Sequence, residues 1–315
     1  NRQTMEKKFG LRPLDEKTPG YGFEPEFEVE AFLSQVNQNA ARKIDANALI
    51  YLTRAMDYFN MTRGGVELAS LFAGAQYHAL LVSYKSDWRY PPQDVSKDAE
   101  LQDILVTTYH RPDAYGFHAL EVLQCLVERR AGGETGVRRV KCLEGDAVWQ
   151  AGKDGLYDPQ LLEAAITRAK RKSSQFGKRP LEQLVKKPFL FHLEYRDGLK
   201  ANVINLDGAV WEWCAAWREK GKENIQSTLF WTQEKRPYGH FTFLVQGIEN
   251  TFHTNRPTWP TERTLLTTGL LDALLRSKSK GGEIIETPHL AIPYKSDWSW
   301  KEPPAPPKER PWNKQ

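Results

Sequence analysis

The sequence predicts a mixed α/β protein of the α+β kind, in which a mostly antiparallel open sheet in the second half is covered by helices on one face. A mainly helical segment with one or two strands precedes that sheet. Short apolar–polar alternations between residues 189 and 232 indicate the strands. The helical runs beside them end at Gly132-Gly133 and Gly281-Gly282, because glycine favours helix C-termini. The aromatic content of 10 Trp, 12 Tyr and 14 Phe suits broad sheets and packed interfaces.

The first segment, residues 1–97, is expected to be mainly helical. Apolar residues recur at helical spacing in three runs, and a buried strand is expected at residues 79–84. The three helical runs are residues 27–42, 45–60 and 66–73. Asp87 closely follows the strand, and a carboxylate at the carboxyl end of a strand lies where α/β enzymes assemble their sites. Asp87 is therefore either a catalytic acid or a turn or helix-capping residue.

The second segment, residues 98–294, is expected to carry the open sheet. The predicted strands are residues 104–108, 137–149, 189–195, 200–206, 211–217, 227–232 and 290–294. The predicted helices are residues 114–130, 158–172, 238–253 and 261–280. Tight turns at Asp197-Gly198 and Asp207-Gly208 are expected to join successive strands into an antiparallel meander. The proline-rich tail, residues 295–315, is expected to be extended or disordered.

The predicted sheet has one strongly aromatic face. Trp211, Trp213 and Trp217 alternate along one strand and therefore point to the same side. Such a face must pack against something. Since helices cover only one side in this prediction, the other side is a candidate surface for pairing two copies of the chain.

Charge and cysteine content exclude several classes of protein. The net charge of +4 is small and both signs are mixed along the chain, so no nucleic-acid partner is expected. No run of 18 apolar residues occurs, so no membrane span is expected, and residues 1–10 are too polar for a signal peptide. Cys125, Cys142 and Cys214 include no C-x-x-C pair, which favours reduced thiols in a cytoplasmic protein without a metal site.

Residues 27–33 and 44–59, followed by Ser86-Asp87-Trp88-Arg89-Tyr90-Pro91-Pro92, resemble the lid, late sheet and acid loop of homoserine O-acetyltransferase. The resemblance covers residues 1–95. It implies an α/β-hydrolase fold and acyl transfer through Ser, Asp and His, with Asp87 as the acid. The nucleophile is missing, because the required Gly-x-Ser-x-Gly motif occurs nowhere in the chain. An acid without its Ser cannot perform triad chemistry.

Three segments of the second part resemble the glucose–fructose oxidoreductase, inositol dehydrogenase and rhizopine-catabolism family (Gfo/Idh/MocA). These segments are residues 115–121 (Tyr-Gly-Phe-His-Ala-Leu-Glu), residues 127–137 (Val-Glu-Arg-Arg-Ala-Gly-Gly-Glu-Thr-Gly-Val), and residues 258–269 with Glu286-Thr287-Pro288. The resemblance covers residues 103–294. It implies a Rossmann domain that binds NAD or NADP, and a C-terminal domain that contacts a sugar or polyol and forms a homo-oligomer through its open sheet. The chain has no Gly-x-Gly-x-x-Gly loop and so no complete Rossmann domain, and we expect it to bind no dinucleotide alone.

His118 is the candidate catalytic residue of the second part. The family commonly carries Asp-x-Gly-x-His here, and its imidazole can accept a hydroxyl proton as hydride leaves for the nicotinamide. Gly116 and His118 fit that pattern, whereas Ala114 occupies the acid position. The helix start is expected to disfavour a protonated ring. A packed or hydrogen-bonded structural histidine is the alternative.

The chain therefore reads as a mosaic, and three functions stay open. The first is an oxidoreductase-family substrate and oligomerisation domain that lacks its dinucleotide-binding half. The second is an acyltransferase, in which Asp87 and His118, 31 residues apart, would lie within hydrogen-bond reach. The third is a non-catalytic homo-oligomeric interaction module. The pentapeptide at residues 84–88 recurs at residues 294–298, through either recombination or chance.

Overall fold

The computed structural model describes residues 88–232, 245, 247, 253–254 and 258–295. The chain divides into two compact units, residues 1–77 and 78–315, and every described residue belongs to the second. Asp87, the helices and strand predicted before it, and the proline-rich tail from residue 296 lie outside the described residues. Most of the helix predicted at residues 238–253 also lies outside them.

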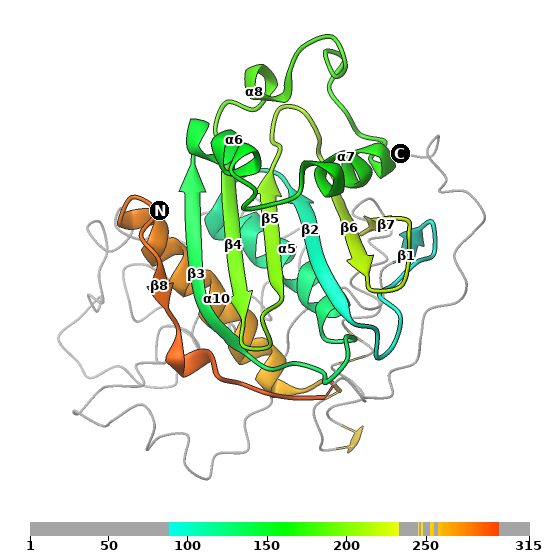
Figure 1. Cartoon of the computed structure of the whole chain (residues 1–315), viewed down its shortest axis with the longest axis vertical. Helices are drawn as coiled ribbons and strands as arrows, with labels where there is room; N and C mark the ends of the chain where they lie inside the picture. The colour runs from blue at the N-terminus through cyan, green and yellow to red at the C-terminus, as the bar shows by residue number, and fades with distance from the viewer. Residues whose placement is uncertain (1–87, 233–244, 246, 248–252, 255–257, 296–315) are drawn as a thin grey trace, which may run out of the picture. The chain divides into compact units, whose positions relative to one another are not determined.

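One eight-stranded sheet organises the described part of the chain (Figure 1). Its strand order is β1-β7-β6-β2-β5-β4-β3-β8. The strands are β1 (Trp88–Tyr90), β2 (Leu101–Thr108), β3 (Val137–Glu144), β4 (Phe189–Tyr195), β5 (Lys200–Asn205), β6 (Trp213–Glu219), β7 (Gln226–Trp231) and β8 (Ile285–Glu286). Every neighbouring pair is antiparallel except β2 and β5, which are parallel. The prediction of a mostly antiparallel open sheet is confirmed.

The predicted meander is wrong at one point, because β2 lies between β5 and β6. Asp207-Gly208 is therefore no hairpin turn; it belongs to a connection that crosses from β5 over β2 to β6. The physical reason lies in β2 itself. Ile104, Leu105 and Val106 are all fully buried, so both faces of this strand need cover, and a central position supplies it.

Helices lie on both faces of the sheet (Figure 1). The described α-helices are α5 (Pro112–Val127), α6 (Asp146–Lys153), α7 (Pro159–Arg168), α8 (Leu181–Leu184) and α10 (Thr261–Ser279). The two long helices, α5 and α10, cover one face, as expected. In addition, the shorter α6 and α7 pack on the upper part of the opposite face. Asp158 caps α7 as predicted, because its side chain accepts from the N–H of Gln160 at 2.8 Å.

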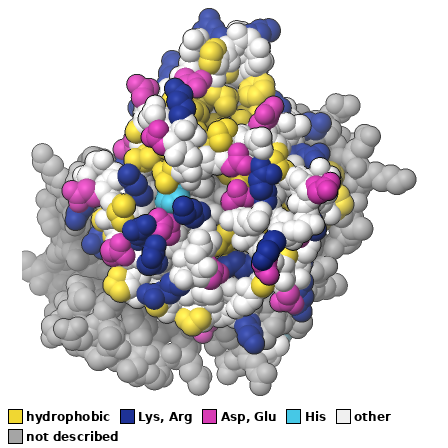
Figure 2. Space-filling view, viewed as in Figure 1, with side chains coloured by type: hydrophobic (Ala, Val, Ile, Leu, Met, Phe, Trp, Pro, Cys, Tyr) yellow, Lys and Arg dark blue, Asp and Glu magenta, His cyan; other side chains and the backbone are white. Residues whose placement is uncertain are grey.

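The aromatic face is on the side of the long helices. Trp213 and Trp217 share one face, as predicted, but they are only 4% and 0% exposed inside the core formed with α5 and α10. These tryptophans are therefore core residues, and the pairing of two copies through the open sheet stays a prediction. The lower part of the opposite face carries charged and polar side chains instead (Figure 2).

Three short segments differ from the predicted elements, the first being residues 146–149, which were expected at the end of a strand and begin helix α6. Residues 88–90, placed by sequence in the first segment, form edge strand β1 and pair with β7. The strand expected at residues 290–294 is a 3-10 turn at Pro288–Leu290, followed by a single bridge between Tyr294 and Glu134. The two-residue strand β8 lies just before them and pairs with β3.

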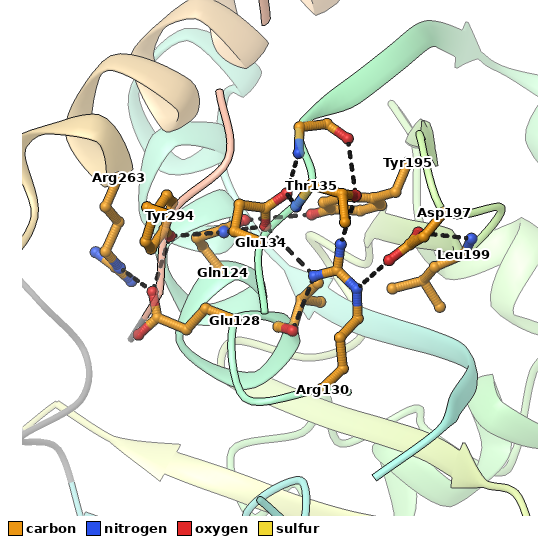
Figure 3. A network of polar contacts seen from close by, with 12 residues as sticks. Gln124, Glu128, Arg130, Glu134, Thr135, Tyr195, Asp197, Leu199, Arg263 and Tyr294 are labelled. Atoms are coloured by element: carbon orange, nitrogen blue, oxygen red, sulfur yellow. Dashed lines mark hydrogen bonds and ion pairs between the residues drawn. The ribbon is translucent and has the colours of Figure 1, made fainter. Parts of the chain in front are cut away.

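A buried polar network joins α5, α10 and the segment that ends at Tyr294 (Figure 3). Arg263 on α10 donates to Glu128 at 3.1 Å and forms an ion pair with Glu121, both on α5. Tyr294 Oη donates to the same Glu128 carboxylate at 2.8 Å. The network continues from Gln124 to Glu134, Arg130, Thr135, Tyr195 and Asp197. The three segments that carry the oxidoreductase resemblance meet in this network.

Candidate functional site

The carboxyl ends of the parallel strands β2 and β5 lie side by side, and one buried amide joins the two loops that leave them. Asn205 Nδ2 donates to the carbonyl of His110 at 2.6 Å. Asn205 Oδ1 accepts from the backbone N–H of Asp207 at 2.9 Å. Ligands in α/β folds bind outside the carboxyl ends of parallel strands. Asn205 therefore fixes His110 and Asp207 at the edge of the sheet where a site is expected.

His110 and Asp207 form the polar half of this candidate site. His110 Nδ1 lies 3.8 Å from Asp207 Oδ1, and the two side chains are 51% and 43% exposed. The indole N–H of Trp211 donates to the same Oδ1 at 3.1 Å and so orients the carboxylate. His110 has a φ of 60°, in the left-handed region. Residues other than glycine rarely adopt it, and strained residues cluster at functional sites.

An aromatic cluster forms the other half. The ring of Tyr115 stacks on Trp213, with centroids 5.6 Å apart and planes inclined by 15°. Both His110 and His118 contact Tyr115 in T-shaped arrangements, at centroid distances of 4.6 and 5.8 Å. The indole N–H of Trp213 donates to Thr108 Oγ1 at 3.3 Å, which ties the cluster to the end of β2. Tyr115 therefore separates two imidazoles that reach the same edge of the sheet.

The structure places His118 beside this cluster but changes one expectation about it. The helix α5 begins at Pro112, so His118 is its seventh residue and lies beyond the first turn. The electrostatic effect of a helix N-terminus fades within the first turn, so the expected bias against a protonated ring does not apply. The other predicted catalytic residue, Asp87, lies outside the described residues, and its distance to His118 stays untested.

Sequence reasoning missed two residues of the candidate site, His110 and Asp207. His110 stood alone in the sequence, and Asp207 was assigned to a turn. The sequence did contain one signal for them. Each follows the end of a buried strand, and Asp87 was selected on the same ground. What the sequence did not show is that β2 and β5 are neighbours, since His110 and Asp207 lie 97 positions apart.

The strand-to-helix loop at the candidate site does not fit the pyrophosphate of a dinucleotide. A pyrophosphate needs bare backbone between a strand and the start of a helix, which glycines provide. The loop from β2 into α5 is Tyr109-His110-Arg111, which fills that position with side chains. Within the part of the chain that the structure describes, no group of three or more His, Cys, Asp or Glu residues could hold a metal ion. Nor is any helix there both long and apolar enough to cross a membrane.

Comparison of sequences finds homoserine acyltransferases. Homoserine O-acetyltransferase of Methanocorpusculum labreanum is 39% identical over 90 residues, 29% of this chain and 18% of that protein. The enzyme of Bradyrhizobium diazoefficiens is 40% identical over 92 residues, 29% of this chain and 23% of that protein. Homoserine O-succinyltransferase of Magnetococcus marinus is 36% identical over 103 residues, which are 33% of this chain and 25% of that protein. The chain thus spans about a quarter or less of the length of these relatives. No known family profile matches the chain.

Comparison of structures finds sugar and polyol oxidoreductases at low similarity. An aldose-aldose oxidoreductase from Caulobacter crescentus, complexed with glycerol, has a TM-score of 0.30 and 13% identity, and the match covers 59% of this chain and 55% of that one. An inositol dehydrogenase homolog from Azotobacter vinelandii, complexed with NADH and myo-inositol, has a TM-score of 0.31 and 11% identity, with 59% and 57% covered. TM-scores this low do not define a shared fold. The sequence comparison confirms the homoserine acyltransferase part of the predicted mosaic.

Proposed function

We propose that the described part of the chain is a binding domain for a small polyhydroxylated molecule, a sugar or polyol, of the kind that serves a nicotinamide-dependent oxidoreductase. The observation that carries this proposal is the pairing of aromatic rings with a His110–Asp207 pair at the carboxyl ends of β2 and β5. Aromatic faces pack on the C–H faces of such molecules, while a few converging polar groups bind the hydroxyls. His118 is proposed as the second imidazole of this site.

The test is a titration of the full chain with glucose, myo-inositol and glycerol, followed by saturation-transfer NMR and calorimetry. We expect His110→Ala and Asp207→Asn each to weaken binding about tenfold, the equivalent of one hydrogen bond. The matched control is His289→Ala, which removes an exposed imidazole at the opposite end of the described chain. Absence of binding to all three ligands, or binding that ignores His110→Ala as it ignores the control, would refute the proposal.

The role of His118 is tested separately, with the variant His118→Ala. His118→Ala removes ring contacts to Tyr115 and Trp213 from a side chain that is only half-buried, so we expect a small loss of stability, about 1 kcal/mol. If His118 binds the ligand, affinity falls with little change in the melting temperature. A melting temperature that falls steeply while affinity per folded molecule is kept would make His118 structural.

Acyl transfer to homoserine is a second candidate, favoured by the sequence matches to homoserine acyltransferases. Against it stands the absence of Gly-x-Ser-x-Gly from the whole sequence. The test is incubation of the chain with homoserine and acetyl- or succinyl-coenzyme A, with mass-spectrometric detection of the ester. Turnover that is abolished by Asp87→Asn and His118→Ala would establish this candidate, and absence of any product would remove it.

We further propose a reducing, cytoplasmic setting. Cys125, Cys142 and Cys214 are all buried free thiols in the structure. Burial raises the pKa of Cys125 and of Cys142 to about 12, which keeps both thiols protonated and unreactive. Alkylation of the denatured, unreduced protein should modify all three cysteines, and fewer than three modified sites would contradict this setting.

A further inference from the structure

The connection from α7 to β4 is strongly basic. Residues 169–187, the basic segment, contain seven Lys and Arg residues and one acid, Glu182, which gives a net charge of +6. The segment lies at the upper end of the sheet in Figure 1, and Figure 2 shows Lys and Arg side chains there. Like charges this close repel one another and destabilise the folded chain unless anions lie near them. The seven cations are Lys170, Arg171, Lys172, Lys178, Arg179, Lys186 and Lys187.

The carboxylates of the described residues do not balance these cations. Elsewhere on the surface, basic side chains have acidic partners: Lys220 lies 2.7 Å from Glu100, and Lys278 lies 2.6 Å from Glu144. Apart from Arg171, by contrast, no cation of the basic segment forms an ion pair with a described residue. All of these cations except the half-buried Lys172 are exposed. The basic segment can therefore receive an anion from outside the chain.

The first end of the basic segment is fixed beside the candidate site. The backbone N–H groups of Lys170 and Arg171 donate to Glu212 Oε2 at 2.6 and 2.8 Å, and Glu212 is only 4% exposed. The N–H of Trp211 donates to the carbonyl of Arg171 at 3.0 Å. Trp211 is also the residue whose indole N–H orients the carboxylate of Asp207. A buried carboxylate thus holds two cations next to the residue that orients Asp207.

The rest of the basic segment packs against the same connection between β5 and β6. The N–H of Ser173 donates to the carbonyl of Ala209 at 2.9 Å. Gly208 has a φ of 98°, and a Cβ there would lie 2.5 Å from the carbonyl oxygen of Leu184. Glycine is therefore required where this part of the segment approaches the residue after Asp207. Contacts near both ends hold the basic segment along the edge of the sheet that carries the candidate site.

We propose that the ligand of the candidate site is a phosphate ester of a sugar or polyol, whose phosphate is bound by Lys170 and Arg171. This inference rests on the proposed function of that site. Phosphate oxygens accept charge-assisted hydrogen bonds from ammonium and guanidinium groups. The carboxylate of Asp207 repels a phosphate but accepts hydrogen bonds from hydroxyls. The charges therefore orient the ligand, with its hydroxyls at Asp207 and His110 and its phosphate on the basic segment.

Matched pairs of ligands test the proposal. Glucose, myo-inositol and glycerol are each compared with glucose 6-phosphate, myo-inositol 1-phosphate and glycerol 3-phosphate by calorimetric titration of the full chain at low salt. We expect the phosphorylated member of at least one pair to bind at least about tenfold more tightly, which is the effect of one charge-assisted hydrogen bond. The ratio of the two affinities is the readout, because it is measured in one protein sample and does not depend on the folded fraction. Raising salt from about 0.1 M to 1 M shortens the screening length from about 10 Å to about 3 Å and should lower this ratio.

The double variant Lys170→Gln and Arg171→Gln locates the phosphate. It keeps the backbone N–H groups that bind Glu212, and it should reduce the ratio to about one. The matched control is Lys97→Gln with Lys220→Gln, which removes two exposed cations beyond the other end of the 8-residue strand β2, about 25 Å away. The control should keep the wild-type ratio. Circular dichroism verifies folding, and if the double variant unfolds, Lys170→Gln alone should lower the ratio at least about threefold.

The outcomes separate this proposal from the function on which it rests. Binding of neutral ligands with no gain from the phosphate overturns this proposal and leaves the proposed function standing. Absence of binding by all six ligands refutes both. Inorganic phosphate that binds as tightly as every ester shows that the basic segment takes any phosphate, which overturns the assignment to a sugar or polyol ester. Equal ratios in the double variant and its control overturn the placement of the phosphate at Lys170 and Arg171.

Discussion

Arg263 is 1% exposed and holds two fully buried carboxylates, Glu121 and Glu128, on the neighbouring helix. Burial raises the pKa of Glu121, and the charge of Arg263 opposes that rise. Removing one partner of a buried ion pair strands the other charge in a low-dielectric interior, which costs more than the pair contributes. At the residue scale, stability therefore depends on this guanidinium rather than on the exposed ion pairs.

We expect Arg263→Met to lower the free energy of unfolding by about 3–5 kcal/mol. Arg276→Met, at an exposed position of the same helix, should cost less than about 0.5 kcal/mol. Urea denaturation of both variants measures the difference. Adding Glu121→Gln and Glu128→Gln to Arg263→Met should recover part of the loss, because no charge is then left unpaired. Equal costs for the two single variants would contradict this account.

Glu219 contributes to the free energy of unfolding in a way that depends on pH, because folding lowers its pKa. Burial alone would raise its pKa, but hydrogen bonds from Lys222, the Ser96 N–H and Trp217 outweigh burial and hold the pKa at about 2. The folded pKa is thus below the unfolded value of 4.5. Its stabilising contribution is present above pH 4.5 and is lost as the pH falls from 4.5 towards 2.

We expect Glu219→Gln to reduce the free energy of unfolding by about 1–3 kcal/mol at neutral pH. The difference from wild type should shrink as the pH falls through that window, since protonation removes the same charge. Urea denaturation at a series of pH values measures it. Glu100→Gln, which changes an exposed carboxylate in an ion pair with Lys220, should show a small difference at every pH. If the difference in free energy of unfolding between wild type and Glu219→Gln stays constant with pH, the lowered pKa of Glu219 is not its cause.

At the scale of elements, the turn before β3 packs closely against the backbone of residues 290–292. Gly136 has a φ of 84°, and a Cβ there would collide with the backbone of residues 290–292. Gly132 has nearly the same φ of 81° but open space around it. Comparing the two separates the cost of the conformation from the cost of the close approach.

We expect Gly132→Ala to cost about 1–2 kcal/mol, the usual penalty of a left-handed residue with a side chain. Gly136→Ala should cost at least about 2 kcal/mol more, because backbone cannot yield as a flexible side chain can. Amide exchange of Tyr294, whose N–H donates to the Glu134 carbonyl at 3.2 Å, should accelerate only in Gly136→Ala. Similar costs for both substitutions would show that the segment is free to move away.

For the molecule as a whole, a ligand that binds the folded state raises the melting temperature. The described loop after β2 does not suit a pyrophosphate, so we expect neither NAD nor NADP to shift the melting temperature of this chain. A sugar or polyol that binds the His110 site should shift it, and His110→Ala should abolish that shift. Cofactor reduction by the chain with any member of a sugar and polyol panel, or a shift with either dinucleotide, would refute this prediction.

The sequence by itself determined the elements that depend only on residues close together in the chain. The hairpin of β4 and β5 follows from alternation and the Asp197-Gly198 turn, and α7 begins where Asp158 can cap it. The long helix α10 ends at Gly281-Gly282 as predicted. The segments that carry the oxidoreductase resemblance lie in the core rather than at the candidate site. Arg263 and Glu121 join α10 to α5, and Arg130 binds Glu134 and Asp197.

Only the tertiary structure decided what depends on which strands are neighbours. The insertion of β2 between β5 and β6 brought His110 to Asp207, and it also aligned Asp103 with Lys200 and Arg218. The same insertion converted an expected hairpin turn into a crossing connection. Periodicity reports which residues of a strand share a face, but it carries no information about the strand that lies alongside. That choice is made by burial over the whole sheet, which is why the candidate site was absent from the sequence prediction.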